Sequence, residues 1–173
     1  MASRRICIHS HGYTLVEVLI VIGLILMLMG LSMFIDLHNY FGGAFRSEQN
    51  TLITLLQTAR ADALNNVDEL PHGVAAHPAD HPQSYVVFEG ASYGASDEES
   101  RRVFEAAYPV LFDAASPSEI VFCQLSGDAT SGVSAGTDCE DPVNAFDGNI
   151  VMTDTVRQLT LSIFVNHEGS ISW

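Results

Sequence analysis

The chain has 173 residues, and its 21 acidic residues against seven basic ones give a formal net charge of −14. All seven basic residues are arginine. Because so acidic a chain repels a phosphate backbone, we expect no general affinity for nucleic acid. The length leaves room for one membrane segment and one small folded domain.

An apolar run over residues 13–35 dominates the first part of the chain. From Val18 to Ile35 it contains 18 residues without a charge. As a helix rising about 1.5 Å per residue, this stretch would span roughly 27 Å, close to the ~30 Å hydrocarbon core of a bilayer. Since a helix of a soluble core is seldom apolar on every face over such a length, the run is interpreted as a membrane-spanning helix.

The charges on either side of the run predict its orientation. Residues 1–12 form a short basic leader with Arg4 and Arg5, whereas the far side begins with Asp36. By the positive-inside rule, the N-terminus is cytoplasmic and the C-terminal part lies outside the cytoplasm. The chain is thus expected to be a single-pass cell membrane protein.

Residues 36–66 are expected to continue the helix with one apolar face. Apolar side chains recur at spacings of three and four, at Leu52, Leu55, Leu56, Ala59 and Ala63. Polar faces are assigned to Arg46, Glu48, Gln57 and Arg60. Because glycine weakens a helix, Gly42-Gly43 predicts a kink or soft spot, and Asn65-Asn66 predicts the end of the helix.

Residues 67–173 are expected to form a β-rich globular domain. Segments rich in β-branched and aromatic residues predict strands at 84–90, 119–125, 149–153 and 158–165, with a last short strand at the C-terminus. Residues 70–83 contain three prolines and predict a loop with at most a short edge strand. Residues 96–107 fit either a helix with a Ser96–Glu99 capping box or a strand. The fold class is α+β, with a long N-terminal helix packed on an antiparallel sheet.

The three cysteines suggest one disulfide. Cys7 lies in the leader, whereas Cys123 and Cys139 lie in the expected extracytoplasmic domain. Removal of the leader would leave an even pair in an oxidising compartment, where a disulfide persists. A bridge there would stabilise the domain by about 3 kcal/mol in the chain-entropy model. The alternative is two free thiols.

No small-residue cleavage site follows the apolar run, and the candidate cut lies before it, between Gly12 and Tyr13. The stretch HGYTLVEVLIVIGLI combines a basic leader, a glycine, an aromatic residue, Thr-Leu and Glu17 in one order. It resembles the N-terminal signature of type IV prepilins and type II secretion pseudopilins. The resemblance implies a pilin-like fold, cleavage after Gly12 by a membrane-embedded prepilin peptidase, and N-methylation of Tyr13 by the same enzyme.

The same resemblance assigns an assembly role to Glu17. A carboxylate at the centre of a bilayer is unfavourable by about 2.5–3.5 kcal/mol, and by less near its edge. In the family, glutamate at this position pairs with the terminal amine of a neighbouring subunit, which fixes the axial register. The alternative is a carboxylate tolerated at a helix N-terminus by the helix dipole. The implied partners are other pilin or pseudopilin subunits and the inner-membrane assembly machinery, in a surface or periplasmic filament.

The rest of the chain is similar, at the level of pattern, to the GspH/FimT-like group of minor pseudopilins. Some members of that group bind DNA through basic residues near the C-terminus. The last 15 residues here contain no arginine or lysine, and Glu168 adds a negative charge. We therefore expect no DNA capture, although a DNA-uptake minor pilin stays an alternative. Another alternative is a signal-anchored extracytoplasmic binding domain that never polymerises.

Two groups of residues contain side chains of the types that bind metal ions. His72, His77 and His81 lie close to Asp80, but their spacing matches no zinc pattern, so a solvated loop is favoured. Acidic residues crowd the loop around Cys139, at Asp128, Asp138, Glu140, Asp141 and Asp147. Calcium binds loops of this kind, but the favoured interpretation is a solvated acidic loop held by the disulfide, without a cofactor. No pattern of a catalytic triad or phosphate-binding loop occurs, so no enzyme activity is expected.

These expectations divide the chain into four regions: a leader (1–12), a transmembrane and filament-core helix (13–35), its amphipathic second half (36–66) and a globular domain (67–173).

Overall fold

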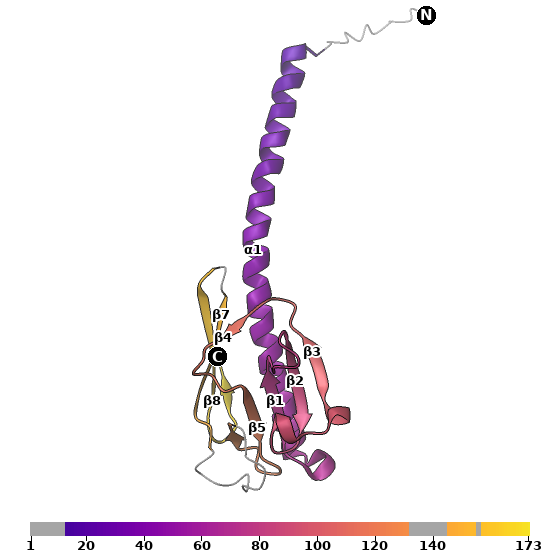
Figure 1. Cartoon of the computed structure of the whole chain (residues 1–173). Coiled ribbons are helices and arrows are strands. Elements are labelled where there is room, and N and C mark those ends of the chain that lie inside the picture. Colours follow the sequence, from indigo (N-terminus) through magenta and orange to yellow (C-terminus); the bar gives the residue numbers. More distant parts are fainter. Residues whose placement is uncertain (1–12, 132–144, 155–156) are drawn as a thin grey trace, which may run out of the picture. The chain divides into compact units, whose positions relative to one another are not determined.

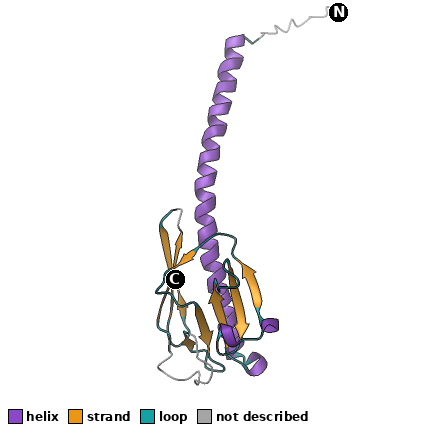
Figure 2. Ribbon diagram, viewed as in Figure 1, coloured by secondary structure: helices purple, strands orange, loops and turns teal. Residues whose placement is uncertain are grey.

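The computed structural model describes residues 13–131, 145–154 and 157–173, and the backbone alone for residues 32–42. The chain divides into two units, Met1–Gly42 and Gly43–Trp173, which are described separately. Figure 1 shows the elements in chain order, and Figure 2 shows their types.

A single helix, α1, runs from Leu15 to Leu64. It continues through Gly42 and Gly43, where the sequence predicts a kink or soft spot. It ends where predicted, because Asn66 adopts a left-handed φ of 55°, which stops the helical path. The freed carbonyl of Ala63 accepts hydrogen bonds from Asn66 N at 3.1 Å and from Leu125 N at 3.0 Å. The loop around Leu125 therefore helps to cap the end of the helix.

Nine strands follow the helix in the described part of the chain. They are β1 (His72–Ala76), β2 (Ser84–Glu89), β3 (Arg102–Glu105), β4 (Leu111–Phe112), β5 (Glu119–Phe122), β6 (Ala129–Thr130), β7 (Gly148–Asp154), β8 (Leu159–Val165) and β9 (Ile171–Ser172). They form two antiparallel sheets, in the orders β3-β2-β1-β5-β6 and β4-β7-β8-β9. The α+β fold, with an N-terminal helix followed by antiparallel sheets, is thus confirmed. Each predicted strand corresponds to an observed one, namely β2, β5, β7, β8 and β9.

The prediction for residues 70–83 was wrong. β1 lies at the centre of the five-stranded sheet, between β2 and β5, and its first four residues are buried. Gly73 makes this position possible, because a β-carbon there would lie 2.9 Å from the carbonyl oxygen of Ile120 and against the ring of Phe88. The prolines that suggested a loop lie outside the strand, so they do not interrupt its hydrogen bonds.

The main core lies between the second part of α1 and the two sheets. The predicted stripe of α1 is buried, and Phe45 and Ile53 join it. The sheets contribute the large side chains Val74, Tyr85, Val87, Ile120, Phe122, Ile150, Met152, Ile163 and Val165. A smaller cluster on the other face of the first sheet consists of Ala75, Phe88 and Val121, with Tyr93 packed against it. Because both faces of β1, β2 and β5 are covered, the buried residues of these strands are mostly apolar, whereas the edge strand β3 is exposed.

The ambiguous segment 96–107 contains both a short helix and a strand. Two 3-10 helices, η2 (Tyr93–Ala95) and η3 (Glu98–Ser100), precede β3, and a third, η1 (Val67–Glu69), follows α1. The side chain of Asp97 caps η3 by accepting a hydrogen bond from Glu99 N. The predicted capping residue, Ser96, instead donates its hydroxyl hydrogen to the carbonyl of Tyr93.

Candidate functional site

The start of α1 is capped by the threonine of the motif. Thr14 Oγ1 accepts a hydrogen bond from Glu17 N at 3.3 Å, and the Thr14 carbonyl accepts one from Val18 N at 3.3 Å. Threonine is a favoured N-cap because its oxygen satisfies an amide that the helix leaves free. Tyr13, one residue before the cap, is 81% exposed. The backbone at Tyr13 is thus outside the helix, while Gly12 lies outside the described residues.

Glu17 lies in the first turn of α1 with an exposed side chain. Among the residues that the structure describes, Glu17 forms no ion pair. The dipole of the helix favours a carboxylate at this end, where amide groups point outward. The helix therefore tolerates Glu17 without an ion pair from the described residues.

The side chains around Glu17 form a long apolar surface on α1. Exposed large apolar residues occupy every face of the helix between residues 15 and 31: Leu15, Val16, Val18, Leu19, Ile20, Val21, Ile22, Leu24, Ile25, Leu26, Met27, Leu28, Met29 and Leu31. An apolar surface of this extent marks a site of interaction with a partner protein or a membrane. In the described residues, no helix has the length and apolar character needed to cross a membrane.

A second glutamate of α1 was wrongly assigned to a polar face. Glu48 is 4% exposed, and its Oε1 accepts hydrogen bonds from Ala107 N at 2.8 Å and Tyr108 N at 3.1 Å. Burial and the charge of Glu48 both raise the pKa of the Tyr85 hydroxyl. Periodicity could not reveal this role, because the amides that Glu48 binds belong to an irregular segment distant in sequence.

Cys123 is buried directly after β5 and is disulfide-bonded. Cys139 lies outside the described residues, so the pairing of Cys123 with Cys139 stays a prediction. Of the acidic residues around it, Asp128 and Asp147 are exposed, and the other three also lie outside the described residues. Calcium binding in this loop is therefore untested.

The three histidines have different surroundings. His72 is buried in β1, and its Nε2 lies 3.0 Å from the carbonyl oxygen of Val67. His77 packs edge-on against Phe112 with ring centroids 4.9 Å apart, and burial lowers its pKa. His81 is near Asp80 at the surface. Within the described ranges, no three histidine, cysteine or acidic side chains are grouped so that they could hold a metal ion.

Comparison with known proteins gives one match. Residues 8–33 match the family model described as the prokaryotic N-terminal methylation motif. No curated protein and no solved structure matches the chain. The motif is that of prepilins and pseudopilins, a family of structural subunits anchored in the membrane by an N-terminal helix. Through residues 8–33, which include Gly12, Tyr13 and Glu17, the chain matches the prepilin and pseudopilin family.

Proposed function

We propose that the chain is a structural subunit of a type IV pilus-like or type II secretion pseudopilus filament. The observation that carries this proposal is the methylation motif at residues 8–33, located at the start of a helix with an apolar surface on every face. In a filament, the helices of neighbouring subunits would bury this surface. The favoured subgroup is the GspH/FimT-like minor pseudopilins, because the sequence pattern of the globular domain is similar to theirs.

Maturation requires access to the bond after Gly12. Tyr13 is exposed and precedes the Thr14 cap, so a peptidase can bind this backbone without unwinding α1. Cleavage would create an amino group on Tyr13, four residues before Glu17, and the same peptidase would methylate it. An α-amino group is largely cationic near neutral pH, so it can pair with the carboxylate of Glu17 in a neighbouring subunit.

Before assembly, residues 13–35 would span the inner membrane, with the leader in the cytoplasm and the globular domain outside. This part of the proposal depends on the uncharged sequence from Val18 to Ile35 and on the arginines of the leader. The proposed partners are the prepilin peptidase, other pilin subunits and the inner-membrane assembly machinery. We propose no catalytic role for the chain itself.

The proposal is tested by mass spectrometry of the chain co-expressed with a prepilin peptidase. We expect a mature protein that begins at N-methylated Tyr13. A bulky residue at the cut site, in Gly12→Leu, should leave the leader in place. Gly30→Leu serves as the control, because Gly30 lies in α1 with open space around it. An intact leader in the unmodified chain, or a different N-terminus, would overturn the proposal.

A further inference from the structure

The start of α1 lies next to the proposed cleavage site (Figure 1). α1 begins at Leu15, and the cut is proposed between Gly12 and Tyr13, so two residues separate the cut from the helix. The exposed side chain of Thr14 fixes this start, because its Oγ1 accepts a hydrogen bond from Glu17 N at 3.3 Å. An oxygen that accepts from the third amide of a helix is the usual N-cap arrangement.

The amide of Glu17 has an alternative acceptor in the backbone. In an α-helix, each amide bonds to the carbonyl four residues earlier, which for Glu17 is the carbonyl of Tyr13. If that bond formed, the helix would take in Thr14 and would use the backbone of Tyr13. The hydroxyl of Thr14 occupies the amide instead, and Tyr13 stays outside α1.

Tyr13 directly follows the proposed cut, so its backbone is part of what a peptidase must bind. An extended substrate pairs with a protein through its own amides and carbonyls, and a carbonyl already bonded inside a helix is not available for this. The neighbouring side chains of Leu15 and Val16 are exposed and apolar. An amide in apolar surroundings needs an acceptor from the chain itself. Without the Thr14 hydroxyl, the expected acceptor of the Glu17 amide is therefore the Tyr13 carbonyl.

The threonines inside α1 use their hydroxyl groups in the opposite way. Thr51, Thr54 and Thr58 each donate the hydroxyl hydrogen to the carbonyl four residues earlier, at 2.8 to 3.0 Å. These bonds leave the helical path unchanged, since the carbonyls already belong to the helix. Thr14 instead accepts from an amide that has no other partner in the described structure, so its oxygen determines where the helix starts.

We propose that the Thr14 hydroxyl is a positioning group for removal of the leader. By capping α1, it keeps the Tyr13 carbonyl out of the helix, where the peptidase binds it as extended backbone. Thr14 acts through the conformation of Tyr13 and takes no part in breaking the bond. The proposal rests on the filament function and adds a specificity determinant of the chain as a substrate of the prepilin peptidase.

The test is cleavage kinetics of the full-length precursor by a purified prepilin peptidase in detergent micelles, with the cleaved fraction measured by mass spectrometry. Thr14→Val keeps the shape of the side chain and removes the acceptor, whereas Thr14→Ser and Thr14→Asn keep an acceptor and change the shape. We expect kcat/KM to fall about fivefold in Thr14→Val, the factor that one cap contributes to a helix equilibrium. The change should lie in KM, because a smaller fraction of the precursor is competent to bind, while kcat is retained. Thr14→Ser and Thr14→Asn should be cleaved within about twofold of the unmodified precursor.

Thr54→Val is the matched control, because it removes a hydroxyl from an exposed threonine of α1 that does not cap the helix. Its cleavage should equal that of the unmodified precursor. Normal cleavage of Thr14→Val together with slow cleavage of Thr14→Asn would overturn the proposal and show that the peptidase recognises the shape of the side chain. Equal slowing of Thr14→Val and Thr54→Val would also overturn it. No cleavage of the unmodified precursor would instead overturn the filament function, and this proposal with it, so the two failures are distinguishable.

Discussion

The two described parts of α1 are one element by secondary structure but differ in what covers them. Between residues 15 and 31 large apolar side chains are exposed on every face, whereas after Gly43 the helix buries one stripe in the core of its own domain. The apolar face of the second part is therefore covered by the chain's own domain. The first part has an apolar surface that the described residues leave exposed.

Two glutamates make the same contrast. Glu17 is exposed and has no ion pair among the described residues, while Glu48 is buried and accepts two backbone hydrogen bonds. Both stand on one helix, Glu17 within an apolar run and Glu48 within the polar stretch RSEQN. A buried carboxylate is stable when it has partners; the fold provides them for Glu48, and we propose that filament assembly provides one for Glu17.

The largest expected effect comes from Glu17→Ala. Loss of the carboxylate should leave expression, membrane association and cleavage intact and reduce incorporation into filaments more than about tenfold, because removal of one member of a buried ion pair costs about 3–5 kcal/mol. Incorporation is measured by immunoblot of sheared filaments. Glu105→Ala removes an exposed carboxylate from β3 and serves as the control. Incorporation equal to that of the control would show that Glu17 has no role in assembly.

For the other glutamate, Glu48→Ala should destabilise the globular domain by roughly 2–4 kcal/mol, since each buried donor left without an acceptor costs about 1–3 kcal/mol. The two donors are the amides of Ala107 and Tyr108. Urea unfolding of the full-length chain in detergent measures the change. Glu48→Gln keeps an acceptor oxygen and should therefore lose less stability than Glu48→Ala. The same urea midpoint for Glu48→Ala and the unmodified chain would contradict the assigned role.

A smaller difference in the free energy of unfolding is expected between alanine substitutions at Gly73, in the globular domain, and at Gly30, in the first part of α1. Gly73→Ala should destabilise the domain by about 1–3 kcal/mol, the usual effect of overpacking, because the added carbon meets Phe88 and Ile120. Gly30→Ala meets nothing within 4 Å and should leave domain unfolding unchanged. Both variants are compared by urea unfolding. An unaffected Gly73→Ala variant would argue against the close packing around β1.

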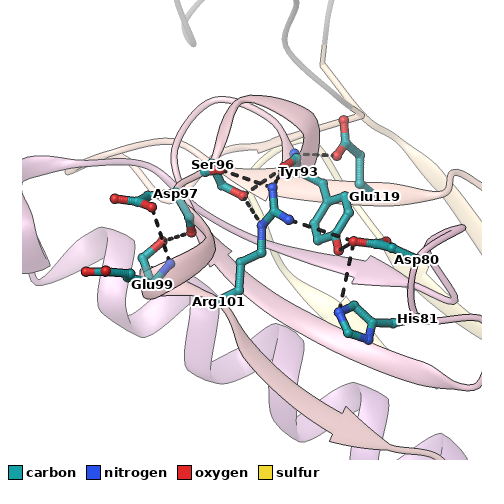
Figure 3. Close-up of polar contacts among 9 residues, drawn as sticks. Asp80, His81, Tyr93, Ser96, Asp97, Glu99, Arg101 and Glu119 are labelled. Carbon is teal, nitrogen blue, oxygen red and sulfur yellow. Dashed lines mark hydrogen bonds and ion pairs between the residues drawn. The ribbon is translucent and has the colours of Figure 1, made fainter.

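The smallest expected effect is on the pH dependence of the stability of the globular domain. Burial lowers the pKa of His77 from its usual value of 6.5, so the unfolded chain takes up this proton before the folded one does. Stability from neutral His77 should therefore be present above pH 6.5 and fall as the pH drops below it. The rings of Tyr85 and Phe112 pack on His77, which lines a pocket of about 510 Å³ together with Asp80, Arg101 and Glu119 (Figure 3).

The measurement compares urea midpoints at neutral and mildly acidic pH for the unmodified chain and for His77→Asn. Asparagine tolerates the positive φ of 50° at this position and does not titrate. The variant should lose less stability on acidification than the unmodified chain. Parallel losses would assign the pH dependence to other groups.

Structural features that depend on local sequence patterns could be predicted from the sequence. The periodic stripe at Leu52 and Leu56, the helix end at Asn65-Asn66 and the apolar strands were predicted because each depends on neighbours in the chain. The motif was recognised for the same reason, since Gly12, Tyr13 and Glu17 lie within one short stretch.

Features that depend on distant contacts were missed. β1 is short and lies among prolines, and only its pairing with both β2 and β5 makes it a central strand. Glu48 is buried because an irregular segment brings two amides to it. The pocket around Tyr93 unites residues from four separate segments, and among its polar residues only Asp80 and His77 stand out in the sequence, as candidate metal ligands.

The central position of β1 has a consequence for the order in which the domain can form. Synthesis delivers β1 and β2 soon after the helix, and these two strands pair across a short connection. The other edge of β1 has no partner until residues 119–122 arrive. During that interval, an apolar strand presents free amide and carbonyl groups, which pair readily with other chains. A nascent chain is therefore most prone to aggregation just before β5 emerges.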